Sequence, residues 1–274
     1  MDSKKQVIVS GGFDDIRSRQ LRFLEEAAKL GELTVLLWPD ETLQQRTGKA
    51  PKLPLAERLY FLNAVRYVAR VVPADTLADP HGLSALAGLK PQAWVEEESD
   101  AHPLRQAFCH KQGVEYRVLP ASQMGGFPNP PPMPSPPGQK KVVVTGCYDW
   151  FHTGHVRFTE EVSAFGDLYV IVGHDANLRL LKGEGHPLFS QEERRYVVGS
   201  IKYVKQALIS SGEGWLDADP EIRRLKPDIY AVNDDGAKGG KREYCEQMGI
   251  EYLVLKRTPA PGLQRRSSTD LRGF

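Results

Sequence analysis

Two histidines three residues apart stand at the start of a predicted helix in the second half of the chain. The apolar stretch 141–145 leads into Gly146 and Asp149, after which His152 and His155 open an amphipathic segment. A glycine at a strand end lets a ligand approach the backbone, and a helix N-terminus offers N–H donors to phosphate. This order of residues predicts a site for a phosphorylated ligand. By itself, a histidine pair at this spacing is as readily a helix cap or a surface feature.

The chain repeats one pattern twice. Residues 4–40 match residues 139–175 without a gap, with 13 identities in 37 positions, and residues 89–119 match residues 225–255 in the same order. A register held over this length indicates an internal repeat.

A Pro-rich segment separates the two copies. Residues 121–139 cannot hold a helix or a central strand, and their composition predicts a semi-rigid spacer. We therefore expect a first domain at 1–120, a linker at 121–139 and a second domain at 140–274.

Each copy is predicted to follow the order β–α–β–α–β–α–β. The predicted strands lie near 6–10, 33–38, 92–96 and 115–119 in the first copy and near 141–146, 168–173, 228–232 and 251–255 in the second. Continuously apolar strands separated by helical patterns are typical of a parallel sheet covered on both faces. The fold class is therefore α/β, with two tandem Rossmann-like, doubly wound domains. Such sheets bind ligands beyond the carboxyl ends of their strands, here after Val144, Val172 and Val232.

The composition excludes several classes of protein. The chain has 36 Lys and Arg against 35 Asp and Glu, and this balance argues against a nucleic-acid or anionic-membrane partner. No apolar run approaches the roughly 18 to 20 residues of a membrane span, and the charged opening has no signal-peptide core. Cys109, Cys147 and Cys245 suggest neither a disulfide framework nor a zinc site. We expect a soluble, cytoplasmic protein of a reducing compartment.

The second copy resembles the cytidylyltransferase-like family of nucleotidyltransferases, whose signature is His-x-Gly-His after the first strand. Other matches are Lys182 in a Gly-rich loop, Arg194 on the following helix, and Arg257 with later serines. The resemblance covers residues 139–271, and the tandem form is similar to that of the ethanolamine-phosphate cytidylyltransferases. It implies transfer of CMP from CTP to a small phosphorylated alcohol, such as ethanolamine phosphate or glycerol 3-phosphate, with release of pyrophosphate.

The resemblance also implies roles for individual residues. His152, His155 and Lys182 would be catalytic, donating to the phosphates and covering the transferring group. An ionised phosphate nucleophile needs no general base, so positioning and charge neutralisation would supply the catalysis. The nucleotide-binding residues would be Gly146, Cys147, Tyr148, Asp149, Gly154, Arg194, Asn233, Asp235, Arg257, Thr258, Ser267, Ser268 and Thr269. Asp175 and Lys202 would bind the acceptor substrate. Mg²⁺ is expected on the nucleotide triphosphate, without protein ligands of its own.

Two other functions fit the same motifs. One is an adenylyltransferase that acts on a sugar phosphate, although the pair Arg257–Thr258 favours CTP. The other is a non-catalytic regulator that binds a nucleotide. Taken singly, Lys182 is also typical of a solvated loop, and Arg194 of an ion pair on a helix face.

The first copy lacks the chemical groups of the second. In the repeat register His152, Gly154 and His155 become Arg17, Arg19 and Gln20. We expect Arg17 and Arg19 to fill the phosphate site, which would make this copy catalytically inactive. It would then form an intramolecular pseudo-dimer with the second copy or bind a regulatory anion, and further homodimerisation stays open.

Overall fold

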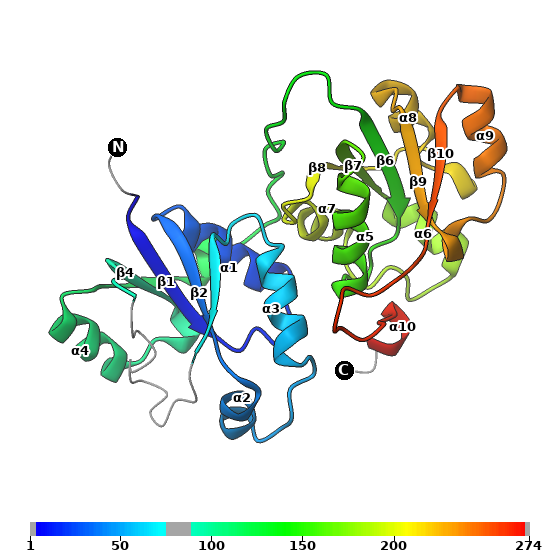
Figure 1. The fold of residues 1–274 in the computed structure, drawn as a ribbon. Helices are drawn as coiled ribbons and strands as arrows, with labels where there is room; N and C mark the ends of the chain where they lie inside the picture. The colour runs from blue at the N-terminus through cyan, green and yellow to red at the C-terminus, as the bar shows by residue number, and fades with distance from the viewer. Residues whose placement is uncertain (1–3, 75–88, 272–274) are drawn as a thin grey trace. The chain divides into compact units, whose positions relative to one another are not determined.

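The computed structural model describes residues 4–74 and 89–271. The chain divides into two compact units, Met1–Gly126 and Phe127–Phe274. Each unit has one five-stranded sheet flanked by helices (Figure 1). Within the described residues, no helix is both long enough and apolar enough to cross a membrane.

The sheet of the first unit has the strand order β3-β2-β1-β4-β5, and its pairings are parallel. Its elements are β1 (Gln6–Gly11), α1 (Ser18–Ala28), β2 (Glu32–Leu37), α2 (Asp40–Thr47), α3 (Leu55–Asn63), β3 (Arg70–Pro73), β4 (Ala93–Glu97), η2 (Glu98–Asp100), α4 (Pro103–Gln112), β5 (Glu115–Leu119) and η3 (Ala121–Met124).

The second unit repeats this order as β10-β9-β6-β7-β8, again with parallel pairings. Its elements are β6 (Lys141–Gly146), α5 (Thr153–Ser163), β7 (Asp167–Val172), α6 (Asp175–Lys182), α7 (Gln191–Gly199), β8 (Val204–Ile209), η4 (Gly214–Leu216), α8 (Asp219–Leu225), β9 (Ile229–Asn233), η5 (Asp234–Gly236), α9 (Lys241–Met248), β10 (Glu251–Leu255) and α10 (Ser268–Leu271). The predicted α/β class with two doubly wound domains is confirmed.

The central strands are apolar because helices cover both faces of the sheet. Val142, Val143 and Val144 of β6 are fully buried. Val143 belongs to a core cluster with Tyr230 of β9 and Ile222 of α8, among others. Continuous apolar strands are the sequence signature of such a sheet.

The prediction of four strands in each copy was wrong, because each sheet has a fifth. The missed strands are β3 and β8, and both lie at an edge of their sheet. β3 has only four residues, and β8 mixes polar with apolar side chains and is only partly buried. An edge strand needs no continuous apolar run, so the pattern used for the central strands did not find them.

Part of the Pro-rich segment packs against the second unit. The N–H of Met133 donates to the carbonyl of Lys205 at 3.0 Å, and Ser135 Oγ donates to Asp167 at 2.7 Å. The unit boundary falls at Gly126, inside the segment predicted to be a spacer.

A buried arginine ties three segments of the second unit together. The Arg194 guanidinium donates to the carbonyls of Phe189 at 2.9 Å and Cys147 at 2.6 Å. It also pairs with Asp175 at 2.7 Å, which balances its charge. These partners belong to the segment before α7, to the turn after β6 and to the start of α6.

The first unit contains the same arrangement around Arg58. That guanidinium, also fully buried, donates to the carbonyls of Leu53 and Gly12 and pairs with Asp40. The first unit lacks the histidine motif, so the arrangement is a feature of the fold in both copies and does not depend on that motif.

Replacing either arginine should lower stability strongly. We expect Arg194→Met and Arg58→Met each to lower the free energy of unfolding by on the order of 3 kcal/mol, because buried carbonyls and a carboxylate lose their donors. Urea denaturation followed by circular dichroism measures this. The control is Arg223→Met, since Arg223 pairs with Asp219 on the exposed side of α8 and such pairs contribute about 0.5 kcal/mol. Similar losses in all three variants would contradict the assignment.

Candidate active site

The turn between β6 and α5 brings the backbone of Gly146 into the site. Tyr148 has a φ of 54°, and its ring lies against Gly146, where an added Cβ would be 2.9 Å from Cε2. Phe13 and Gly11 repeat this turn in the first unit, with a φ of 47° and a Cβ distance of 3.0 Å. A side chain at Gly146 would force the Tyr148 ring to move, and one at Gly11 would press tightly on the Phe13 ring.

The two histidines cap the helix that follows. His152 is the N-cap of α5, and its Nδ1 accepts from the N–H of Gly154 at 3.0 Å. The Nδ1 of His155 in turn accepts from the N–H of His152 at 3.3 Å. Gly154 has no room for a side chain, because a Cβ would lie 2.8 Å from Cε1 of His152. The motif is therefore a reciprocal cap that also fixes both rings.

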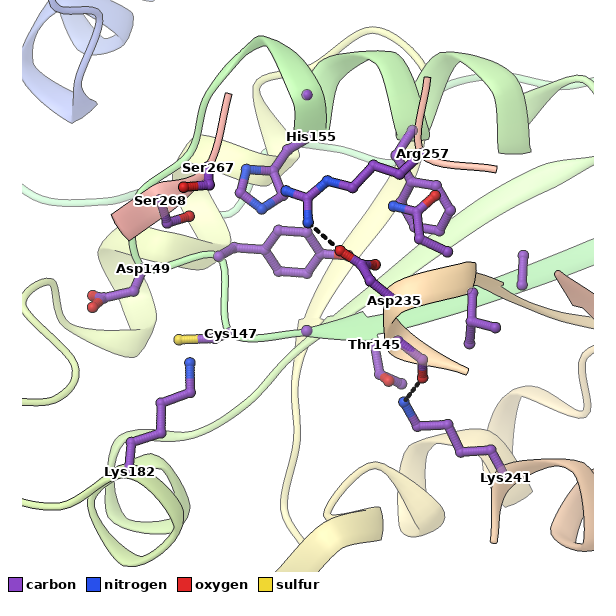
Figure 2. Close-up of a pocket in the computed structure, with 18 residues that line it drawn as sticks. Thr145, Cys147, Asp149, His155, Lys182, Asp235, Lys241, Arg257, Ser267 and Ser268 are labelled. Atoms are coloured by element: carbon purple, nitrogen blue, oxygen red, sulfur yellow. Dashed lines mark hydrogen bonds and ion pairs between the residues drawn. The ribbon is translucent and has the colours of Figure 1, made fainter. Parts of the chain in front are cut away.

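Aromatic rings surround His155. Its ring stacks on Phe151 at a centroid distance of 5.2 Å and meets Tyr148 edge-on at 5.4 Å. Because Nδ1 accepts a hydrogen bond, the proton of the neutral imidazole is on Nε2. Figure 2 shows this ring pointing into the cavity, where Nε2–H can donate to a ligand.

The same surroundings keep His155 uncharged. Burial disfavours the imidazolium and lowers its pKa well below the ordinary value of 6.5, and His152 and Arg257 lower it further. His155 is therefore a neutral hydrogen-bond donor at neutral pH.

A cavity of about 370 Å³ opens at the carboxyl ends of β6 and β9 (Figure 2). Its lining residues are Thr145, Gly146, Cys147, Tyr148, Asp149, Gly154, His155, Phe158, Lys182, Ala231, Val232, Asn233, Asp235, Gly236, Lys241, Arg257, Ser267 and Ser268. The predicted position beyond the strand ends holds for Val144 and Val232. The turn after Val172 does not reach the cavity lining.

Several elements deliver polar groups to this cavity. Lys182 is the last residue of α6, and Figure 2 shows it reaching toward Cys147. Arg257, from the segment after β10, forms an ion pair with Asp235. Ser268 is held by a hydrogen bond from its Oγ to the carbonyl of Trp150 at 3.1 Å.

Most of the predicted site residues lie together in this cavity. They are Gly146, Cys147, Tyr148, Asp149, Gly154, His155, Lys182, Asn233, Asp235, Arg257, Ser267 and Ser268. Asp149 also has a role in the fold, because its Oδ1 accepts from the N–H groups of Leu188 and Phe189. Asp14 makes the equivalent bonds in the first unit.

Four predicted residues do not line the cavity for reasons that the structure makes plain. Arg194 and Asp175 bond to each other and to the scaffold. Lys202 precedes β8, so it lies at the amino ends of the parallel strands, the edge opposite the site. His152 is buried in its capping role.

Two further residues predicted for the site, Thr258 and Thr269, are not among the described residues that line the cavity. Thr258 lines a small neighbouring cavity, and its Oγ1 donates to the carbonyl of Lys256 at 3.2 Å. Thr269 belongs to α10, but its side chain lies outside the described residues.

The sequence prediction missed Lys241, which opens α9 and lines the cavity. A signal for it was present, because Gly239 and Gly240 form a turn after Asn233 and the next residue is a lysine at a helix start. Thr145 and Phe158 were missed because neither residue type indicates chemistry.

The first unit keeps a cavity at the equivalent place, with a volume of about 410 Å³. The expectation that Arg17 and Arg19 fill this site was wrong. Arg17 pairs with Asp15 at 2.7 Å, and Arg19 pairs with Glu97 at 2.9 Å. Neither arginine lines the cavity.

The first unit lacks the side chains that the sequence predicts to bind phosphate. In the repeat register His155, Lys182 and Arg257 correspond to Gln20, Thr47 and Ala121. Its cavity instead includes Asp14, Asp15, Glu97 and Asp100, together with two arginines. Carboxylates at these positions disfavour a polyanionic ligand.

Comparison with known proteins identifies the family of this sequence. The sequence model of the family described as cytidylyltransferase-like matches residues 143–273. The chain belongs to the cytidylyltransferase-like family, and so it is a nucleotidyltransferase by class.

The similar curated proteins differ in how much of them the chain covers. An FAD synthase of Ferroglobus placidus is 41% identical over 120 residues, which are 43% of this chain and 75% of the relative. A bifunctional protein HldE of Geobacter sulfurreducens is 32% identical over 115 residues, 41% of this chain but 23% of the relative. These relatives support nucleotidyl transfer and leave the expected CTP and ethanolamine-phosphate specificity unsupported.

Among solved structures, the lipopolysaccharide core biosynthesis protein of Thermoplasma volcanium is 23% identical, with a TM-score of 0.38. The match covers 44% of this chain and 98% of that one.

The depressed pKa of His155 predicts a pH-dependent loss of stability. The unfolded chain takes up a proton on this residue below about pH 6.5, whereas the folded chain does not. Acidification below pH 6.5 therefore favours unfolding, by at most about 1.4 kcal/mol per pH unit from this residue, and the loss ends at the folded pKa. We expect the wild-type free energy of unfolding, measured in urea from pH 7.5 to 5.5, to fall more steeply than that of His155→Gln.

The control for this experiment is His110→Gln, at an exposed position on α4. If the free energy of unfolding changed equally with pH in the wild type and in His155→Gln, the His155 ring would titrate alike in the folded and unfolded states.

Proposed function

We propose that the second unit transfers an adenylyl group from ATP to the phosphate of a phosphorylated acceptor, with release of pyrophosphate. The observation that carries the proposal is one cavity in which His155, Lys182, Arg257 and two serines converge at the start of α5. Neutral donors and cations around a helix N-terminus suit a triphosphate.

The reaction needs positioning more than proton transfer. An oxygen of the acceptor phosphate attacks the α-phosphorus of ATP, a new P–O bond forms, and the bond to the β-phosphate oxygen breaks. The electron pair leaves with pyrophosphate, and no proton has to be removed from the ionised nucleophile. Nε2–H of His155 and the ammonium of Lys182 would neutralise charge that develops on the phosphate oxygens.

The choice of ATP rests on the FAD synthase of Ferroglobus placidus, an adenylyltransferase by its product. A flavin phosphate is accordingly the first acceptor to test, and a sugar phosphate is the next. A second candidate is transfer of CMP from CTP to a phosphorylated alcohol such as ethanolamine phosphate. It is favoured by the pair Arg257–Thr258, of which Arg257 lines the cavity.

We propose that Mg²⁺ enters with the nucleotide. In the described part of the chain, no group of three or more His, Cys, Asp or Glu side chains is placed to hold a metal ion. The oxygen ligands that Mg²⁺ requires would then come from the triphosphate and water.

We further propose that the first unit takes no part in the chemistry. Gln20, Thr47 and Ala121 stand where the second unit has its phosphate-binding groups. An intramolecular pairing of the two units is the role we favour for it, and a homodimer of the whole chain stays open.

The test of this function is pyrophosphate release by the purified chain with Mg²⁺. ATP and CTP are each offered with FMN, a sugar 1-phosphate, ethanolamine phosphate and glycerol 3-phosphate. We expect turnover with ATP and one of the phosphorylated acceptors. Turnover with CTP alone would favour cytidylyl transfer over adenylyl transfer. Nucleotide binding without turnover for any pair of substrates would favour a non-catalytic regulator that binds a nucleotide.

A matched pair of substitutions locates the reaction within the repeat. His155→Ala should lower kcat by on the order of 100- to 1000-fold, because it removes one donor from the transferring phosphate. Gln20→Ala, at the equivalent position of the first unit, should leave kcat within about twofold. A comparable loss in Gln20→Ala would mean that the first unit also takes part.

A further inference from the structure

The cavity has a second cationic group away from the histidine motif. Lys241 lines it from the first position of α9, and its Nζ donates to the carbonyl of Gly236 at 3.1 Å. In Figure 2 Lys182 lies on the side of Cys147, whereas Lys241 lies on the side of Thr145.

Lys241 has no carboxylate partner, since no ion pair in the described residues involves it. Burial lowers its pKa, which reflects the cost of the charge in this place. The corresponding residue of the first unit, Arg105, forms an ion pair with Glu96, where the second unit has Val232. The second copy therefore leaves its cation available to a ligand.

The surroundings of Lys241 suit a nucleobase better than a phosphate. Ala231 and Val232 provide apolar walls, and the carbonyl of Gly236 is a hydrogen-bond acceptor. A phosphate oxygen there would face a carbonyl dipole of the wrong sign. A planar base can instead pack on the apolar wall and offer both donors and acceptors on its edge.

We propose that Lys241 is a specificity-determining residue that binds the edge of the nucleobase, together with the Gly236 carbonyl. Adenine and cytosine carry an amino group beside a ring nitrogen acceptor, so the amino group donates to the carbonyl while Lys241 donates to the ring. Guanine and uracil place a carbonyl where that amino group stands. The inference rests on the proposed function and names the base-binding side of its site.

The experiment separates base binding from phosphate binding. KM values for ATP, CTP, GTP and UTP are measured in the wild type, in Lys241→Met and in the control Lys238→Met, an exposed lysine of the same loop that does not line the cavity. Inorganic tripolyphosphate serves as a competitive inhibitor that has no base. We expect Lys241→Met to raise KM for the preferred nucleotide at least tenfold and to narrow the differences among the four. Inhibition by tripolyphosphate should stay within twofold, and Lys238→Met should match the wild type.

Other outcomes overturn the inference. Weaker inhibition by tripolyphosphate in Lys241→Met would show that the lysine binds the phosphates. A raised KM for the acceptor alone would show that it binds the acceptor. An unchanged preference among the four nucleotides would show that it does not recognise the base. If Lys241→Met does not fold by circular dichroism, Lys241→Gln replaces it.

A failure of the proposed function is recognised separately. Wild-type chain that releases no pyrophosphate can still be tested by equilibrium dialysis with the four nucleotides. A binding preference that Lys241→Met abolishes would support the base contact, and one that it leaves intact would overturn it.

Discussion

The buried guanidinium of Arg194 is the interaction on which the site depends. One planar group bonds to the turn that precedes the histidines, to the segment before α7 and to Asp175 at the start of α6. α6 ends at Lys182, so the same arginine orients the turn and the helix that carries the lysine. Arg58 does the same in the first unit, which lacks the histidine motif. The arginine therefore holds the strand ends and helix starts in place in both units, although the side chains that these segments carry differ.

The two units differ in the residues placed on that scaffold. Both keep the glycine under an aromatic ring and a cavity at the strand ends. The second adds one neutral donor, His155, and the cations Lys182, Lys241 and Arg257, whereas four carboxylates and two arginines line the cavity of the first. The two cavities are similar in volume, so they differ mainly in the charges that line them. His155 contributes without a charge of its own, because its ring is enclosed by aromatic side chains and fixed by the backbone N–H of His152.

The sequence predicted much of this correctly. The repeat, the parallel sheets and the convergence of the motif residues follow from apolar runs and from glycine and histidine spacing, which are local signals. The edge strands β3 and β8 were missed because partly buried edges need no apolar run. Arg17 and Arg19 were expected to fill a cavity, but each forms an ion pair with a carboxylate of the lining, Asp15 or Glu97, and neither arginine lines the cavity itself.

By itself, the sequence determined the two-copy α/β fold and the class of chemistry. Both follow from local signals, because the apolar runs of the strands and the His-x-Gly-His motif each consist of residues close together in the chain. Only the tertiary structure decided which polar residues meet. It assigned Arg194 and Asp175 to the scaffold, placed Lys202 at the far edge of the sheet and brought Lys241 to the cavity. The physical reason is that the partners of a buried charge, and the edge of a parallel sheet at which a loop emerges, are set by contacts between segments distant in the chain.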